Sequence, residues 1–316
     1  MLSDAQTATV AEVVDRWLRT GASVRRCDRA AAEAAVLAAY AAAGQPAPAF
    51  IVWMDSPYGG ALAVRAVRGR LSPDRLRQLL AGRPGTADVA GVAERAVAAI
   101  AAQLPPGWGD ADAPIDPWAD RDAVRRLVSD AYYGTARQRE VLWHPLGRRL
   151  ESALLTALGG DRLSYTMWDD MDVEIPAADY WEALRAQLTE LRGEAFLGPV
   201  WQLADRLAAH LCAPAPADVT GLRVGDVVGT SPDPEGVVLW HEFGGYLDPR
   251  ATASVVAAFE CAARTVPLPG FPELDALLEV MGQVGRWWPL AEAAVLTDRP
   301  LRVEGRHAEY ADGYCS

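Results

Sequence analysis

The segment from residue 50 to 54 constrains the fold more than any other part of the chain. It is an uninterrupted run of β-forming apolar residues, Phe50-Ile51-Val52-Trp53-Met54, in a sequence otherwise rich in alanine. A short apolar run bounded by turn residues is typical of a strand buried in a protein core. The run ends at Asp55-Ser56-Pro57-Tyr58-Gly59-Gly60, a predicted turn, and a helix is expected from about 61 to 68.

Most other segments have the residue spacing of amphipathic helices. Apolar residues recur three and four positions apart through residues 4–20, which predicts a helix there. Asp28 is expected to cap a second helix that runs to Ala43, and Ser72-Pro73 to start another. Further helices are predicted over 90–104, 122–133, 138–158, 178–192, 196–211, 250–265 and 272–284.

The C-terminal part of the chain differs from this helical body. Three short β-forming runs, at 293–297, 301–304 and 308–310, are separated by Asp298-Arg299-Pro300 and by Gly305. Turn residues between such runs predict a small C-terminal β-meander.

The organisation that follows is α+β, predominantly α-helical with a few short strands. The Pro-, Gly- and Asp-rich segment 105–120 is the best internal linker. We expect a single α-rich domain over residues 1–316, with a subdivision into 1–104 and 121–316 as the alternative.

The types of residue that are absent exclude several kinds of catalytic and binding site. All 30 strongly basic residues are arginine, and the chain contains neither lysine nor asparagine. Lysine Schiff-base catalysis, a phosphate-binding loop with its lysine, and a Cys-His-Asn triad are therefore excluded. The formal charge of −12 makes nucleic acid an unexpected partner, because phosphate binding needs a basic face.

The cysteines and the N-terminus indicate a compartment. Cys27, Cys212, Cys261 and Cys315 are scattered and form no C-x-x-C motif, which is typical of buried thiols. The N-terminus lacks the basic and apolar regions of a secretory signal, and no apolar run is long enough to span a bilayer. We expect a cytoplasmic protein with no membrane partner.

The first candidate site is the turn after the apolar run. Asp55 would stand at the end of a buried strand, beside backbone amides of a glycine turn that can bind an anion. Asp55 is therefore expected as a catalytic acid or base, with Ser56 and Tyr58 as substrate-binding residues. The alternative is a capped strand-to-helix turn in which Pro57 begins the helix.

The second candidate is an acidic segment that follows Trp168. Its carboxylates, Asp169, Asp170, Asp172 and Glu174, could hold a hard cation such as magnesium. Alternatively, Trp168 and these acids could receive a cationic group of a substrate, or the segment is a solvated loop. Trp168 is taken as substrate-binding, and no metal site is assigned.

The third candidate is His241-Glu242, a histidine beside a carboxylate at an expected strand end. Such a pair suits general acid/base catalysis or metal ligation, while a hydrogen-bonded structural histidine is the alternative. His241 and Glu242 are assigned as catalytic candidates. The motif is not H-E-x-x-H, because Gly245 stands where the second histidine would be.

The fourth candidate is Gly285-Arg286-Trp287-Trp288-Pro289 together with Arg299. Adjacent tryptophans and two arginines could form a binding platform for a planar anion or a peptide. The alternative is that the tryptophans fill the junction between the helical body and the meander. Because neighbouring strand residues face opposite ways, at most one of the two is then expected in the core.

Several of these segments, in this order, resemble an uncharacterised bacterial family, mainly actinobacterial, that is known as a domain of unknown function. The shared motifs are W-x-D-S-P at residues 53–57, W-W-P at 287–289 and [DE]-R-P at 298–300. The resemblance covers the two ends of the chain and leaves 105–245 unplaced. It implies no activity, but it gives more weight to Asp55, Trp287, Trp288 and Arg299.

Two functions remain open. The first is an enzyme or small-ligand-binding protein that uses acid/base chemistry on a small metabolite or peptide, with a pocket between the Asp55 turn and the region of Trp287, Trp288 and Arg299. The second is a non-catalytic interaction or regulatory module with a protein partner bound by exposed tryptophans, of which the chain has 11. No motif identifies a cofactor.

Overall fold

A computed structural model describes residues 4–69, 71–81, 87–108, 270–304 and 307–314, with the single residues 141, 142, 146, 149, 153, 257, 260, 261, 263 and 264. The chain divides into two compact units. The first consists of Met1–Ala22, Trp143–Ala213 and Pro249–Asp275. The second consists of Ser23–Leu142, Pro214–Asp248 and Ala276–Ser316.

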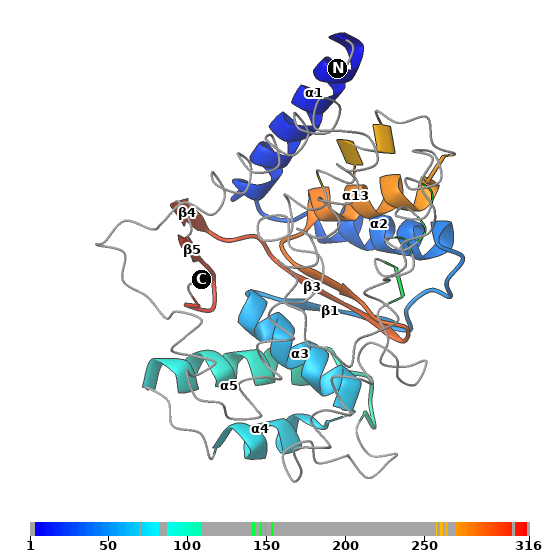
Figure 1. Ribbon diagram of the computed structural model, residues 1–316. Helices are drawn as coiled ribbons and strands as arrows, with labels where there is room; N and C mark the ends of the chain where they lie inside the picture. The colour runs from blue at the N-terminus through cyan, green and yellow to red at the C-terminus, as the bar shows by residue number, and fades with distance from the viewer. Residues whose placement is uncertain are drawn as a thin grey trace, which may run out of the picture. The chain divides into compact units, whose positions relative to one another are not determined.

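The described elements are helices with a few short strands, which confirms a mixed α+β class (Figure 1). The helices are α1 Asp4–Gly21, α2 Arg29–Ala42, α3 Pro57–Gly69, α4 Pro73–Ala81, α5 Ala87–Ala101 and α13 Pro272–Gln283. The strands are β1 Phe50–Met54, β2 Trp287–Pro289, β3 Ala293–Thr297, β4 Arg302–Glu304 and β5 His307–Glu309. The helices predicted within 122–133, 178–192 and 196–211, and most of those within 138–158 and 250–265, lie outside the described residues.

Two sheets divide the predicted C-terminal meander between them. In the larger sheet the strand order is β1-β3-β2, with β3 parallel to β1 and antiparallel to β2. Strands β4 and β5 form a separate antiparallel pair. Strand β3 was expected beside the 301–304 run, but it pairs with β1 and β2, and this fully buried apolar strand thereby has a hydrogen-bonded neighbour on each side.

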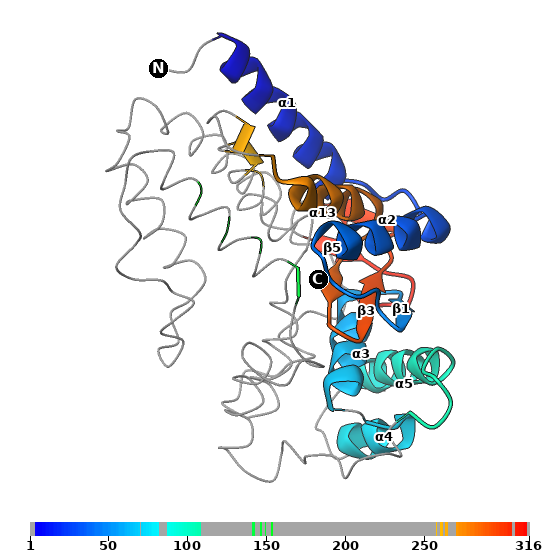
Figure 2. The same cartoon turned by 90° about the vertical axis from the view of Figure 1, so that its right-hand side faces the viewer.

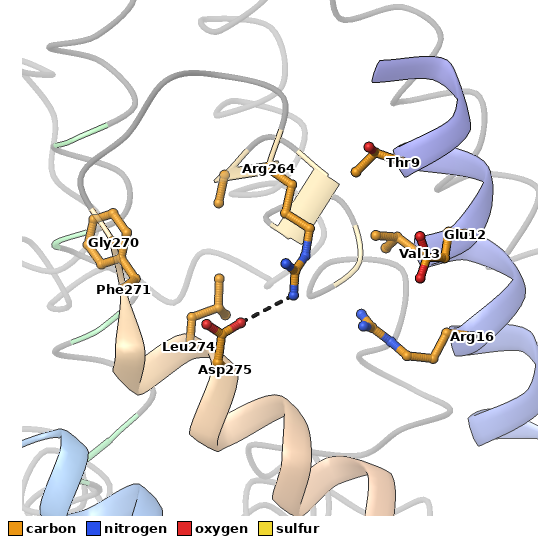
Figure 3. A pocket seen from close by; sticks show the side chains of 10 residues that line it. Thr9, Glu12, Val13, Arg16, Arg264, Gly270, Phe271, Leu274 and Asp275 are labelled. Carbon is orange, nitrogen blue, oxygen red and sulfur yellow. Dashed lines mark hydrogen bonds and ion pairs between the residues drawn. The ribbon is translucent and has the colours of Figure 1, made fainter. Parts of the chain in front are cut away.

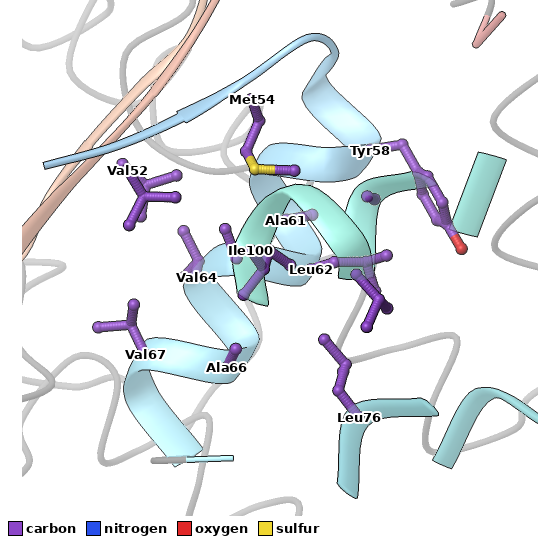
Figure 4. Close-up of a cluster of buried hydrophobic side chains, with 14 of the residues drawn as sticks. Val52, Met54, Tyr58, Ala61, Leu62, Val64, Ala66, Val67, Leu76 and Ile100 are labelled. Atoms are coloured by element: carbon purple, nitrogen blue, oxygen red, sulfur yellow. The ribbon is translucent and has the colours of Figure 1, made fainter. Parts of the chain in front are cut away.

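Helices cover both faces of the three-stranded sheet in the second unit. Helices α3 and α5 lie on one face, and α2 with the C-terminal part of α13 lies on the other (Figure 1 and Figure 2). Alternate strand residues therefore point into two different cores. Val52 and Met54 pack with residues of α3 and α5 in the core shown in Figure 4, and Trp288 belongs to the same cluster.

The opposite face of the sheet contacts α2. The indole Nε1 of Trp53 donates a 2.8 Å hydrogen bond to Glu33, and Tyr40 donates one of 2.6 Å to the carbonyl of Leu290. Asp28 caps α2 as predicted, because its carboxylate accepts a 3.1 Å bond from the amide of Ala31.

Helix α1 is the main described element of the first unit. Val10, Val13 and Trp17, three of the residues on the apolar face expected from the sequence, are almost fully buried. Within the described part of the chain, no helix has both the length and the hydrophobicity needed to cross a lipid bilayer.

Candidate functional site

Strands β1 and β3 end side by side, and polar residues follow both of them. Met54 is paired with Thr297, and the amide of Asp298 donates a 2.8 Å hydrogen bond to the carbonyl of Met54. Asp55 and Asp298 therefore leave the sheet at the same level of two adjacent parallel strands. The carboxyl edge of parallel strands is where α/β sheets place their ligands.

The turn at Asp55-Ser56 is a helix cap. The Oγ of Ser56 accepts a 3.1 Å bond from the amide of Gly59, and its carbonyl accepts one of 2.9 Å from Gly60. Helix α3 therefore begins at Pro57 rather than near residue 61. The glycine amides that were expected to bind an anion are occupied by this cap.

Ser56 also joins the cap to the C-terminal turn. Its hydroxyl donates a 2.5 Å hydrogen bond to Oδ2 of Asp312, whose Oδ1 accepts a 3.0 Å bond from the amide of Tyr314. Arg95 on α5 donates to the carbonyl of Asp312 at 2.5 Å. Gly313 has a φ of +84°, which a residue with a side chain rarely adopts. Sequence reasoning missed Asp312 because an Asp-Gly pair is an ordinary turn signal.

Of the predicted residues in this turn, only Asp55 is exposed to solvent. Ser56 is fully buried, and Tyr58 is buried against Tyr314 in a stacked ring pair with centroids 6.0 Å apart. Ser56 and Tyr58 thus support the position of Asp55 instead of presenting themselves to a substrate.

The carboxyl of Asp312 has an unusual environment. Burial raises its pKa, and the charge of Asp55 adds to this, while the hydrogen bonds from Ser56 and Tyr314 partly oppose it. A buried carboxyl of raised pKa next to an exposed carboxylate is an arrangement that enzymes use to separate an acid from a base.

Replacing Asp312 with asparagine is expected to reduce the pH dependence of stability. Because the folded state raises the pKa, the folded protein holds this proton more tightly than the unfolded chain does. The stabilisation is complete below the unfolded pKa and is lost as the pH rises through the folded pKa. Asp312→Asn removes that titration. Thermal unfolding from about pH 4 to about pH 8 measures it, with Asp74→Asn on α4 as an exposed control. An unchanged slope in Asp312→Asn would contradict the assignment.

A cation stands beside the end of β3. Arg29 on α2 forms a 2.6 Å ion pair with Asp298, and its guanidinium lies over the Trp53 ring, 5.0 Å from the centroid. The side chain of Arg29 is 45% exposed. Its other N–H groups have no partner among the described residues, and a guanidinium group is a good donor to an anionic oxygen.

Arg299 was expected to bind a substrate, but its guanidinium is used within the protein. It donates a 2.8 Å bond to Ser23 and further bonds to the carbonyls of Gly282 and Val284. Burial lowers its pKa. Arg299 therefore fastens the segment before α2 and the end of α13 to the strand edge.

The tryptophans of β2 correct the expectation of a binding platform. Trp287 and Trp288 are both fully buried, whereas at most one was expected in the core. Both are buried because the sheet has helices on each face. Arg286 is also buried, and its guanidinium lies 5.8 Å from the centroid of the Trp288 ring. Among the described tryptophans, none is exposed.

Two buried cysteines are free thiols in the described residues, Cys27 and Cys261. Burial raises the pKa of Cys27, and it raises that of Cys261 to about 12. A thiol of raised pKa and low exposure is a poor nucleophile, so neither is a candidate for thiol catalysis.

Several sequence candidates lie outside the described residues, namely Trp168, His241, Glu242 and the carboxylates Asp169, Asp170, Asp172 and Glu174. Within the described part of the chain, no three His, Cys, Asp or Glu side chains gather as a metal site.

Comparison with protein-family models, with characterised proteins and with solved structures finds no match to this chain.

Proposed function

We propose that this protein is an enzyme that performs general acid/base chemistry on a small anionic metabolite or peptide at the strand edge where β1 and β3 end. The observation that carries this proposal is the placement of Asp55 and Asp298 at the same level of adjacent parallel strands. The function rests on this geometry and on the chemistry of the residues around it.

Asp55 is the group that moves a proton. It is exposed, whereas the residues that follow it are held inside the protein by the α3 cap and by Asp312. A fixed backbone on one side and solvent on the other give the carboxylate a defined position with access to a substrate.

Arg29 makes the proposed site selective for a negatively charged substrate. A guanidinium that uses one edge on Asp298 and lies over Trp53 is held in place, and its remaining donors suit a carboxylate or a phosphate. Arg29, which is paired with Asp298 after β3, would then bind the substrate, and Asp55, at the neighbouring end of β1, would transfer the proton.

The test compares Asp55→Asn with the unaltered protein in a bacterial small-metabolite extract, with mass spectrometry used to follow compounds consumed or formed. We expect Asp55→Asn to lose about 100-fold or more of the rate, the usual contribution of a general acid or base. Its thermal midpoint should barely change, because surface substitutions usually alter stability by less than about 0.5 kcal/mol.

Two further variants sharpen this result. Arg29→Gln should raise KM more than it lowers kcat, and Asp74→Asn should match the unaltered protein. An extract in which the unaltered protein changes no compound, or in which Asp55→Asn works at the same rate, would rule out the proposal.

A further inference from the structure

The first unit contains a cavity of about 590 Å³ that belongs to no part of the proposed site. Helix α1, the region of Arg264 and the start of α13 form its walls (Figure 3). Its volume falls in the range of small-molecule sites. Figure 3 shows the guanidinium groups of Arg16 and Arg264 converging on the middle of this space.

A buried glutamate holds the two arginines together. Glu260 is fully buried, and its Oε1 accepts a 2.7 Å bond from Nε of Arg264. Its Oε2 accepts from Arg16 and, at 3.1 Å, from the indole of Trp17. A buried carboxylate with three donors is well satisfied, and it fixes both guanidinium groups while leaving each of them other N–H donors.

Each arginine keeps donors that face the cavity. The side chains of Arg16 and Arg264 are 42% and 40% exposed. Arg16 has no second partner among the described residues, and Arg264 uses one further nitrogen on Asp275 at 3.2 Å. Guanidinium groups fixed by a buried anion are preorganised for an oxyanion.

The rest of the wall limits what such an anion can be. Val13, Phe271 and Leu274 supply apolar surface, while Glu12 and Asp275 place two carboxylates on the same cavity. Those carboxylates repel a highly charged ligand. A single oxyanion on an apolar body therefore fits best.

We propose that this cavity is a second binding site, specific for a small molecule that carries one carboxylate or phosphate group on an apolar body. The oxyanion lies between Arg16 and Arg264, and the apolar body contacts Phe271 and Leu274. This inference is independent of Asp55 and of the function proposed for the strand edge.

Calorimetric titration with four probes tests the site: phenylacetate, phenyl phosphate, neutral phenylacetamide and cationic phenethylamine. We expect one or both anions to bind at least about tenfold more tightly than the amide, because hydrogen bonds to a charged acceptor are stronger than those to a neutral one. The anion that binds more tightly shows whether the site prefers a carboxylate or a phosphate. Equal binding of phenylacetate and phenylacetamide, or no binding of any probe, would overturn the proposal.

Variants of α1 separate binding from structure. Arg16→Gln should lose the preference for the anion, whereas Arg19→Gln, on the same helix and outside the cavity wall, should keep it. Glu12→Gln should bind the anion several-fold more tightly, because it removes a repelling charge, and Asp15→Asn should not. The expected gain in anion affinity of Glu12→Gln still tests the site if Arg16→Gln does not fold. Weaker anion binding by Glu12→Gln would contradict the site.

Discussion

Replacing Gly60 with alanine is expected to lower the free energy of unfolding by at least about 2 kcal/mol, within the range typical of overpacked cores. Gly60 lies in the first turn of α3, against the ring of Trp288. A Cβ there would stand 2.5 and 2.6 Å from two ring carbons and 2.9 Å from Cγ2 of Thr297. The ring is fully buried and cannot move away, so α3 would be forced off the sheet.

Two other helical glycines serve as matched controls for Gly60→Ala. Gly282 in α13 is exposed and has nothing within 4 Å of an added Cβ, so Gly282→Ala should stabilise the protein by about 1 kcal/mol or less through helix propensity. In Gly59→Ala the close contact of the new Cβ is with the flexible methyl of Met54, at 2.9 Å, while Cβ of Met54 and Oγ of Ser56 lie 3.4 and 3.6 Å away, so this variant should cost less than Gly60→Ala. Urea unfolding, monitored by tryptophan fluorescence, measures the order of stability of the three variants. A Gly60→Ala protein as stable as Gly282→Ala would show that α3 does not pack closely on β2.

The strands could be predicted individually from sequence, and the antiparallel pair of β4 and β5 was part of the predicted meander, but the parallel pairing of β1 with β3 could not be predicted. The apolar run at 50–54 and the run at 293–297 both form strands with the expected bounds. Their parallel register joins residues that are far apart in the chain, and short apolar runs carry no signal for a distant partner. The predicted meander instead assumed that strands close in sequence pair with each other.

The candidate site could likewise be predicted only in part from the sequence. Asp55 and Ser56 could be selected because a polar turn follows a buried strand, and the cap and Pro57 explain the turn in detail. Asp312 could not be selected, because its burial and its bond with Ser56 arise only when the C-terminal turn meets the start of α3 in the folded protein. Which helices cover each face of the sheet likewise depends on tertiary packing. Because both faces are covered, both tryptophans of β2 are buried.

Replacing Trp288 with alanine is expected to cost about 3–5 kcal/mol of stability, the usual loss for a buried aromatic residue. The ring belongs to the same buried cluster as Val52 and Leu62 and contacts no solvent. Loss of this side chain would leave a cavity between β2 and α3, because Gly60 has no side chain with which to fill it. Many proteins have only about 5–15 kcal/mol of total stability, so the variant should unfold at much lower urea concentration.

A milder pair of substitutions distinguishes the two tryptophans of β2. The Nε1 of Trp287 is buried and has no hydrogen-bond partner among the described residues, so Trp287→Phe removes an unsatisfied N–H together with part of the ring. This gain offsets some of the lost packing, and Trp287→Phe should therefore cost less than Trp288→Phe. Both variants should retain the probe binding of the Arg16 cavity, which neither ring lines. A Trp288→Ala protein with the stability of the unaltered protein and a loss of ligand binding alone would contradict this prediction. The Trp288 ring would then be a binding surface, and α3 would not pack closely on β2.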